Sequence, residues 1–420
     1  MSTAKTSFPK EKIKVLLLEG VHPAGAAMLR EEGFSVDTSA KAFDETALAK
    51  ALAGGVHVLG IRSKTQVSAG VLAQASRLLT VGCFCIGTNQ VALDDACQRG
   101  VAVFNSPFSN TRSVAELTIA EIIALHRRMS DQSAAMHKGV WDKSAAGAHE
   151  VRGRTLGIVG YGHIGSQVSI LAEAMGMRVV FFDILSKLPL GNARPCRSLE
   201  ELLKASDVVT LHIPATKQTE GLLGRAQLKL LRKGAHVINN ARGSVVDIAA
   251  LAEAIRSGHV GGAALDVFPY EPSGNDEGFK SELLGLPNVI LTPHVGGSTE
   301  EAQESIALDV CDKLARFINV GGTTGCVNLP QVDLPPQGSG AGPGSGTRTH
   351  RILHVHSNVP GVLSKVNALI ARLGVNITAQ YLQTNKHVGY AVLDVEEQNG
   401  KAILAGLREL PETIRARALW

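Results

Sequence analysis

A glycine-rich turn in the middle of the chain restricts its fold more than any other segment. A short apolar run, residues 155–159, leads into Gly160-Tyr161-Gly162-His163-Ile164-Gly165, and the residues that follow are patterned as a helix ending at Gly176. A second apolar run, residues 178–182, then ends at Asp183. This order of strand, glycine turn, helix, strand and acid predicts a βαβ unit.

Each glycine of the turn has a physical task in such a unit. Gly160 allows the tight turn, Gly162 lets the backbone approach a pyrophosphate, and Gly165 lets the helix lie close to the strand. Asp183 follows at about the 20-residue spacing of the acid that binds a ribose 2′-hydroxyl, and its charge would repel a 2′-phosphate. A lone G-x-G-x-x-G sequence is often an accidental turn, but with both strands, the helix and the acid it predicts NAD binding.

Size and composition limit the number of domains and the kinds of partner. At ~150 residues per domain, the 420 residues correspond to two or three domains, and 45% hydrophobic residues are ample for folded cores. The 42 basic and 38 acidic residues give a formal charge of +4 and are spread along the chain, so nothing favours nucleic acid. A small anionic substrate remains open.

The termini and cysteines bear on location and metal binding. Residues 1–12 are polar and lack the apolar core of a secretory signal, and no run reaches ~18 apolar residues, so we expect a soluble cytoplasmic protein without membrane contact. Six cysteines fit a reducing compartment. Cys83-x-Cys85 has the wrong spacing for a zinc pair and lies in an apolar run, which favours buried thiols, and we expect no metal.

The first hundred residues form an α/β unit of their own. Apolar runs at 13–18, 56–61, 78–83 and 101–104 alternate with helical stretches, which predicts a parallel, doubly wound sheet.

Two loops of this unit follow strands, where open α/β sheets bind ligands. The loop from Arg62 to Thr65 suits a carboxylate or phosphate, although a solvated loop is an equally good interpretation of that segment alone. The loop 105–112 leads into a long helix, for which Ser113-x-x-Glu116 predicts a capping box.

Four more apolar runs follow the glycine turn, at 207–213, 235–239, 262–268 and 289–292, and each ends in polar residues. Among these residues are Arg242, Glu271 and His294. A histidine transfers a proton near neutral pH, a carboxylate beside it raises its basicity, and a guanidinium binds a carboxylate. The three suit oxidation of a 2-hydroxy acid, with hydride passing to a nicotinamide. Each alone is more often structural, and the sequence leaves open whether they meet.

These residues resemble those of the D-2-hydroxyacid dehydrogenase family, in particular its D-3-phosphoglycerate dehydrogenase branch of the bacterial type. The resemblance covers nearly the whole chain. Its most specific stretches are Gly82-Cys83-Phe84-Cys85-Ile86-Gly87-Thr88-Asn89-Gln90, Ser109-Asn110-Thr111-Arg112-Ser113-Val114-Ala115-Glu116, the glycine turn itself, and Thr292-Pro293-His294-Val295-Gly296-Gly297-Ser298-Thr299.

The resemblance implies roles for individual residues. Arg242 would bind the substrate carboxylate, Glu271 would orient His294, and His294 would be the acid/base. Arg62, Ser63 and Asn110 would contact substrate, and Lys143 would reach a neighbouring subunit's site in a homotetramer. Besides the three glycines of the turn, the cofactor contacts would be His163, Ile164, Asp183, Asn240, Ala241, Arg242, Asp266, His294, Gly296 and Gly297, with Gly296-Gly297 as a hinge.

A third unit follows a segment with five glycines in nine residues, 338–346, which reads as a flexible linker. The pattern of residues 349–420 is βαββαβ, a ferredoxin-like order. This unit resembles an ACT domain, and the resemblance implies that His356, Asn358 and Asn376 bind L-serine as an inhibitor. A dimerisation module without ligand is the alternative, and the glycine-rich linker would weaken coupling to the active site.

We therefore expect two doubly wound, Rossmann-like or flavodoxin-like domains and a ferredoxin-like ACT domain. The expected bounds are 1–108 with 298–332 for a discontinuous substrate domain, 109–297 for the NAD domain, 333–348 for the linker and 349–420 for the ACT domain. The resemblance implies NAD-dependent oxidation of 3-phospho-D-glycerate to 3-phosphohydroxypyruvate, the first committed step of L-serine synthesis. The alternatives are a dehydrogenase for another acid, such as 2-oxoglutarate, and a non-catalytic NAD-sensing regulator.

Overall fold

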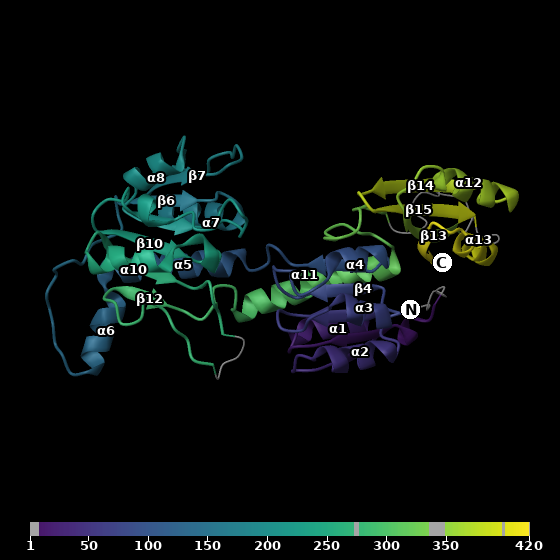
Figure 1. Ribbon diagram of the computed structural model, residues 1–420, viewed down its shortest axis with the longest axis horizontal. Coiled ribbons are helices and arrows are strands. Elements are labelled where there is room, and N and C mark those ends of the chain that lie inside the picture. The colour runs from purple at the N-terminus through teal and green to yellow at the C-terminus, as the bar shows by residue number, and fades with distance from the viewer. Residues whose placement is uncertain (1–7, 273–276, 336–348, 397–399, 420) are drawn as a thin grey trace. The chain divides into compact units, whose positions relative to one another are not determined.

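The computed structural model describes residues 8–272, 277–335, 349–396 and 400–419. The chain divides into two compact units, one of Met1–Ser109 with Gln303–Trp420 and one of Asn110–Ala302. Figure 1 shows the helices and strands of each. Residues 336–348 of the predicted linker lie outside the described residues, and the predicted domain bounds stay predictions.

The first unit contains a five-stranded parallel sheet with helices on both faces. Its strand order is β2-β1-β3-β4-β5, a doubly wound order. Successive side chains of β3 enter two different cores, since Val58 packs on one face and Leu59 on the other. The strands are β1 (Lys14–Leu17), β2 (Ser35–Thr38), β3 (Val58–Ile61), β4 (Thr80–Cys83) and β5 (Ala102–Asn105), and the helices are α1 (Pro23–Glu31), α2 (Glu45–Ala53), α3 (Ala69–Gln74) and α4 (Leu93–Gln98).

Helix α11 (Glu300–Asn319) contributes its residues from 303 onward to this unit. It packs directly on the sheet because β4 carries a glycine at the contact. A Cβ on Gly82 would lie 2.7 Å from Cγ1 of Val310 and 2.9 Å from Cδ1 of Leu314. The sheet is therefore covered partly by a helix far away in the sequence, which makes this unit discontinuous.

The C-terminal part of the first unit is a four-stranded antiparallel sheet with two helices. Its order β14-β15-β13-β16 and its βαββαβ sequence confirm the predicted ferredoxin-like fold. Inside it, buried Arg351 holds both oxygens of Asp394 at 2.7 and 2.8 Å. The elements are β13 (Thr349–Ser357), α12 (Val362–Arg372), β14 (Ile377–Thr384), β15 (Val388–Glu396), α13 (Gly400–Arg408) and β16 (Thr413–Leu419).

The second unit is built on a seven-stranded parallel sheet. Its order, β12-β11-β10-β9-β6-β7-β8, reverses direction between β6 and β9, and such a switch point is where open α/β sheets bind ligands. Figure 1 shows β12 and β7 toward opposite ends of the stack. The strands are β6 (Thr155–Val159), β7 (Arg178–Phe182), β8 (Arg194–Pro195), β9 (Val208–Leu211), β10 (Ala235–Asn239), β11 (Val260–Leu265) and β12 (Val289–Leu291).

Helices cover both faces of this sheet. Residues of α5 (Thr111–Arg127) and α7 (His163–Ala174) share one core with β6, while residues of α8 (Leu199–Ala205) and α10 (Ile248–Arg256) share another. The short α9 (Arg225–Leu228) joins the second core, whereas α6 (Met129–His137) contributes no buried residue. Two doubly wound sheets and a ferredoxin-like unit confirm the predicted fold class.

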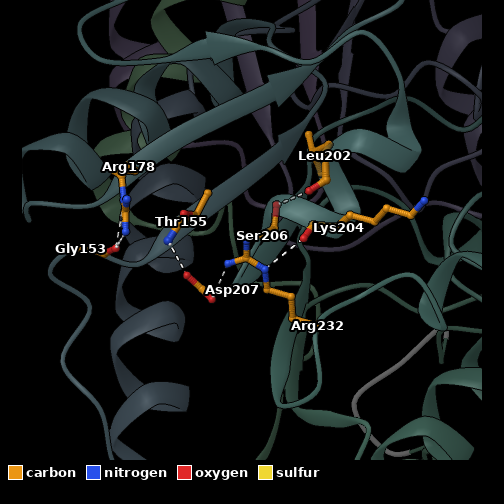
Figure 2. A network of polar contacts seen from close by, with 8 residues as sticks. All are labelled: Gly153, Thr155, Arg178, Leu202, Lys204, Ser206, Asp207 and Arg232. Atoms are coloured by element: carbon orange, nitrogen blue, oxygen red, sulfur yellow. Dashed lines mark hydrogen bonds and ion pairs between the residues drawn. The ribbon is translucent and has the colours of Figure 1, made fainter.

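The amino ends of three neighbouring strands in this sheet are joined by a polar network (Figure 2). Asp207 accepts hydrogen bonds from the amide of Thr155 at 2.8 Å and from Arg232 at 3.2 Å. Arg232 also donates to the carbonyl of Lys204, and Arg178 donates twice to the carbonyl of Gly153. These bonds satisfy main-chain groups where β6, β7 and β9 begin.

The predicted capping box at the start of α5 is wrong. The helix begins at Thr111 with Asn110 at the N-cap, so Ser113 and Glu116 lie inside its first turns. Ser113 instead lies 2.9 Å from the hydroxyl of Thr299, and Glu116 pairs with Arg112. The predicted end of α7 is correct, since Gly176 has φ +78° just beyond Ala174.

Candidate active site

The glycine turn joins β6 to α7 and has the shape of a pyrophosphate cradle. A Cβ on Gly160 would lie 2.4 Å from the carbonyl oxygen of His212, and one on Gly165 would lie 2.2 Å from the carbonyl oxygen of Gly160. A Cβ on Gly162 would meet nothing within 4 Å, so the outer side of the turn is open. Because Gly162 caps α7 without a side chain, the positive end of the helix dipole is open to an anion.

Asp183 lies beside this turn at the end of β7. Its Oδ2 accepts the amide of Tyr161 at 2.8 Å and its Oδ1 accepts the amide of Leu185 at 2.9 Å. Two main-chain amides thus hold the carboxylate at the edge of the turn. This position fits the ribose role expected of Asp183, and the turn and acid together fit an NAD molecule.

Asp266, just past β11, builds the turn that presents His294. Its two oxygens accept the hydroxyl of Thr292 at 2.6 Å and the amides of Val295 and Gly296 at 2.8 and 2.7 Å. His294 itself has φ +55°, a left-handed conformation that few residues other than glycine adopt. The buried carboxylate stabilises this turn and so fixes the direction of the imidazole.

His294 and Glu271 form the hydrogen-bonded pair that the family resemblance implies. Nδ1 of His294 lies 2.8 Å from Oε2 of Glu271, whose Oε1 accepts the amide of Phe268 at 3.0 Å. The carboxylate favours a proton on Nδ1, which leaves the lone pair on Nε2 for a reacting group. About half of the histidine side chain is exposed, at 52%.

Electrostatics within the pair favour a basic imidazole. The hydrogen bond that His294 donates to Glu271 raises the pKa of His294 above its ordinary value, although burial and the charge of Arg242 oppose this effect. Burial works to raise the pKa of Glu271, but the hydrogen bond with His294, the amide of Phe268 and the charges of His294 and Arg242 lower it overall. Arg242 therefore acts on both partners through its charge.

Arg242 follows β10 on a turn with its own internal bonds. Asn239 donates to the carbonyl of Arg242 at 3.0 Å and accepts the amide of Ala241 at 3.2 Å. Nη1 of Arg242 donates to the carbonyl of Ala241 at 2.7 Å. These bonds hold the turn together, and among the described residues no carboxylate forms an ion pair with this guanidinium. It can therefore bind the carboxylate of a ligand in a fork.

The turn is also held by a buried acid that the sequence analysis missed. Nδ2 of Asn240 donates to Glu121 at 2.7 Å and lies 3.0 Å from the hydroxyl of Thr118, both on α5. Burial raises the pKa of Glu121 to about 7, against the hydrogen bond from Asn240. The available signal was spacing, because Thr118, Glu121, Ile122 and Leu125 recur at the helical period of a buried face.

The remaining predicted residues lie in several places. Asn110, buried at the N-cap of α5, is in the second unit close to Gly297, where a Cβ would lie 2.2 Å from its Nδ2. Close packing thus already requires a glycine there, and the hinge stays a prediction. His163 and Ile164 open α7, and Lys143 is exposed on the segment after α6. Arg62 and Ser63 belong to the first unit, in the loop after β3.

Sequence comparisons identify the family. The model of the D-isomer specific 2-hydroxyacid dehydrogenase, NAD binding domain, matches residues 119–296, and that of the AHAS small subunit-like ACT domain matches residues 352–415. A D-3-phosphoglycerate dehydrogenase of Dictyostelium discoideum is 50% identical over 99% of each chain. The chain belongs to the D-3-phosphoglycerate dehydrogenase family. Other members of the family, from Haemophilus influenzae and Escherichia coli, are 50% and 48% identical over at least 99% of each chain.

Solved structures of D-2-hydroxyacid dehydrogenases are similar to the chain. An NAD-complexed D-isomer specific 2-hydroxyacid dehydrogenase from Lactobacillus delbrueckii ssp. bulgaricus has a TM-score of 0.66 and 26% identity, covering 75% of this chain and all of the other. A D-2-hydroxyisocaproate dehydrogenase has a TM-score of 0.69 at the same identity and coverage. The predictions of an oxidoreductase and of NAD as its cofactor are confirmed.

The three predicted effector residues of this D-3-phosphoglycerate dehydrogenase family member lie in the ACT unit. Nδ1 of His356, on β13, donates to the carbonyl of Ser357 at 2.9 Å, while its buried Nε2 has no hydrogen-bond partner among the described residues. Asn358 donates to the carbonyl of Asn385 at 2.8 Å, and Asn376 lies 3.4 Å from Glu396. His356 and Asn358 lie on one segment, and Asn376 comes just before β14.

Metal-binding clusters and membrane-spanning helices are both absent from the described part of the chain. No group of three or more His, Cys, Asp or Glu side chains there could hold a metal ion, and no helix there is long and apolar enough to cross a membrane. All six cysteines are free thiols, with Cys83 buried and Cys85 half-buried.

Proposed function

We propose that this protein oxidises 3-phospho-D-glycerate to 3-phosphohydroxypyruvate with NAD, the first committed step of L-serine synthesis. The observation that carries the proposal is the 2.8 Å contact between His294 and Glu271, in the same unit as the glycine turn and Asp183. The names of the relatives from D. discoideum, H. influenzae and E. coli support this substrate.

The proposed roles follow from what each side chain can do. Nε2 of His294 takes the proton of the substrate hydroxyl, and Glu271 stabilises the imidazolium that forms. Arg242 binds the substrate carboxylate and holds the reacting carbon near the histidine. The glycine turn and Asp183 would hold NAD, which would supply the acceptor for the hydride that leaves the same carbon. Asn110, Arg62, Ser63 and Lys143 would complete the substrate contacts, the last from a neighbouring subunit.

Steady-state kinetics test the substrate. NADH formation is measured with 3-phospho-D-glycerate and with unphosphorylated 2-hydroxy acids, and NADH consumption is measured with 2-oxoglutarate. We expect the highest kcat/KM for 3-phospho-D-glycerate. A higher value for another acid would favour the broader dehydrogenase reading. A protein that binds NADH and turns over none of these acids would favour a regulator.

We propose that L-serine binds the ACT unit and inhibits the enzyme. The buried, unpartnered Nε2 of His356 and the amide of Asn358, two residues further along the chain, offer polar groups suited to an amino acid, whereas Asn376 lies beside Glu396 at the other end of the sheet. Inhibition curves with L-serine test this, using His356→Ala beside the exposed control His387→Ala. The first variant should need more serine for half-inhibition. Curves that superimpose on the wild type would rule out His356 as a ligand.

We propose a homotetramer, in which α6 and the segment after it are covered by another subunit. Four large apolar side chains of this segment are at least half exposed, namely Met129, Met136, Val140 and Trp141. A run of exposed apolar residues of this kind is typical of an interface. Light scattering of the wild type gives the assembly, and a monomer at micromolar concentration would contradict the proposal.

A further inference from the structure

A single carboxylate, that of Glu19, accepts hydrogen bonds from the main chain of the loop from Arg62 to Thr65. Oε1 of Glu19 accepts the amides of Arg62 at 3.2 Å and Thr65 at 2.9 Å, while Oε2 accepts the amide of Lys64 at 3.0 Å. Glu19 lies just past the end of β1, the strand next to β3 in the sheet. One side chain thus fixes three main-chain amides of a loop on the neighbouring strand.

The backbone of Glu19 is in an unfavourable conformation for its residue type. Its φ of +62° lies in the left-handed region, which is strained for a non-glycine residue. Gly20, with φ +63°, has no such strain. A chain that needed only a turn here could use glycine at both positions. A glutamate at position 19 is therefore explained by its carboxylate, which glycine could not supply.

The loop is also fixed from the other side. Nε2 of Gln90, a buried residue, donates to the carbonyl of Arg62 at 2.6 Å. The amide and the carbonyl of Arg62 are both occupied, so its backbone has a single position. Ser63 and Lys64 are exposed, Arg62 is half-buried, and Thr65 is buried. The side chains of the loop that reach solvent, Arg62, Ser63 and Lys64, are of types that bind anions.

The clamp changes how the loop can bind an anion. Consecutive main-chain amides in a turn commonly form a concave anion site. Here the amides of Arg62, Lys64 and Thr65 already face the internal carboxylate of Glu19. These three amides are therefore not available to a ligand, which leaves the side chains of Arg62 and Ser63 as groups that can bind it. A carboxylate can accept all three amides, whereas a glutamine has one acceptor oxygen and an NH₂ group that would face an N–H donor.

We propose that Glu19 is a positioning residue for substrate binding, which acts through the backbone of residues 62–65 and sets the side chains of Arg62 and Ser63. This inference rests on the proposed function, because it takes the ligand of Arg62 and Ser63 to be the anionic substrate. Glu19 itself touches main-chain amides of the loop.

Steady-state kinetics of Glu19→Gln test the inference. We expect the KM for 3-phospho-D-glycerate to rise by about tenfold or more, from the loss of charge-assisted hydrogen bonds worth roughly 1.5–3 kcal/mol, with kcat changed less than about threefold. The Kd for NADH should stay unchanged. Glu45→Gln, an exposed glutamate at the start of α2, is the matched control for lost charge and should keep the wild-type KM.

A double variant separates positioning from general destabilisation. If Glu19 acts through Arg62, the KM of Arg62→Ala should change little when Glu19→Gln is added, because the two effects are not additive. Additive effects, or a wild-type KM in a folded Glu19→Gln protein, would overturn the inference. If Glu19→Gln does not fold, Gln90→Leu tests the inference in its place. This substitution removes the hydrogen bond to the carbonyl of Arg62 and should raise the KM for 3-phospho-D-glycerate in the same way.

The activity of the wild type tests the proposed function, and the comparison of the variants with the wild type tests the role of Glu19. A wild type that produces no NADH from 3-phospho-D-glycerate would remove the proposed substrate, whatever the variants do. A wild type that is active, with Glu19→Gln and Gln90→Leu indistinguishable from it, would remove the role of Glu19 alone.

Discussion

The strands of the seven-stranded sheet carry the same kinds of side chain at their amino ends and at their carboxyl ends, but use them in different ways. We call these two sides of the sheet the amino edge and the carboxyl edge. At the amino edge, Asp207 accepts a main-chain amide and the guanidinium of Arg232, and the guanidinium of Arg178 is bound to a carbonyl (Figure 2). At the carboxyl edge, Asp266 also accepts main-chain amides. Carboxylates that hold the backbone therefore occur at both edges.

The difference lies in the groups beside those carboxylates. Arg232 has a carboxylate partner, whereas the guanidinium of Arg242 makes one hydrogen bond among the described residues, to the carbonyl of Ala241. His294 uses Nδ1 on Glu271 and keeps Nε2 for another molecule, in a left-handed backbone conformation. The amino edge satisfies its polar groups internally and contributes stability. The carboxyl edge leaves the guanidinium of Arg242 and Nε2 of His294 able to bind a ligand, and the backbone of His294 is strained there.

Removing the imidazole should have the largest effect. His294→Asn keeps a residue type that tolerates positive φ, and it removes the acid/base group. We expect kcat to fall by ~10²–10⁴, the usual contribution of a general base. NADH binding, measured by fluorescence, should persist because the glycine turn is intact. A kcat within about threefold of the wild type would show that the carboxyl edge is as structural as the amino edge.

Neutralising the carboxylate beside His294 should have a smaller effect with a defined pH signature. Since Glu271 raises the pKa of His294, the wild-type imidazole stays protonated to higher pH than a free one. Oxidation needs the neutral form, so the rate rises as pH passes that pKa. In Glu271→Gln the pKa falls, and the acidic limb of the kcat/KM profile should move to lower pH. The plateau should drop by roughly tenfold or more, yet less than the loss in His294→Asn. An acidic limb that does not move would separate Glu271 from the histidine.

Residues whose role depends on their spacing along adjacent elements could be predicted from the sequence. The glycine turn, Asp183 and the end of α7 follow from spacing along a few adjacent elements, and the structure bears out their geometry. The contact of His294 with Glu271 was also expected, but on family resemblance. Their separation of 23 residues carries no helical or strand period that would place them together.

Residues that act through other elements were missed or misjudged. Glu19 and Glu121 make their key bonds to segments 43 and 119 residues away. Helical spacing places Glu121 on a buried face of α5, but no local pattern shows which segment either acid holds. Ser113 and Glu116 matched a capping pattern, but the helix begins earlier, and both side chains have other partners. Local patterns identify motifs, whereas the packing of elements decides which buried acid holds which loop.

Changing the acid beside the glycine turn should alter cofactor choice moderately. Asp183→Asn removes the charge that favours a ribose 2′-hydroxyl and opposes a 2′-phosphate. We expect the KM for NAD to rise roughly tenfold, as for loss of one charge-assisted hydrogen bond, and the KM for NADP to fall. Initial rates with both cofactors measure this. Unchanged KM values for both would place Asp183 with the structural acids of the amino edge.

The smallest effect on activity should come from the amino edge itself. Asp207→Asn removes the charge between the amide of Thr155 and Arg232, at a side chain only 21% exposed. We expect a loss of about 1–2 kcal/mol in stability and a Tm lower by roughly 2–8 °C, with kcat and KM unchanged. Glu200→Gln is the matched control, since its pair with Lys204 is exposed on both sides and should contribute ~0–1 kcal/mol. Calorimetry and steady-state rates on the same samples separate the two edges. If Asp207→Asn lowered kcat as well as Tm, the amino ends of β6 and β9 would be coupled to the chemistry at their carboxyl ends, and the contrast between the edges would fail.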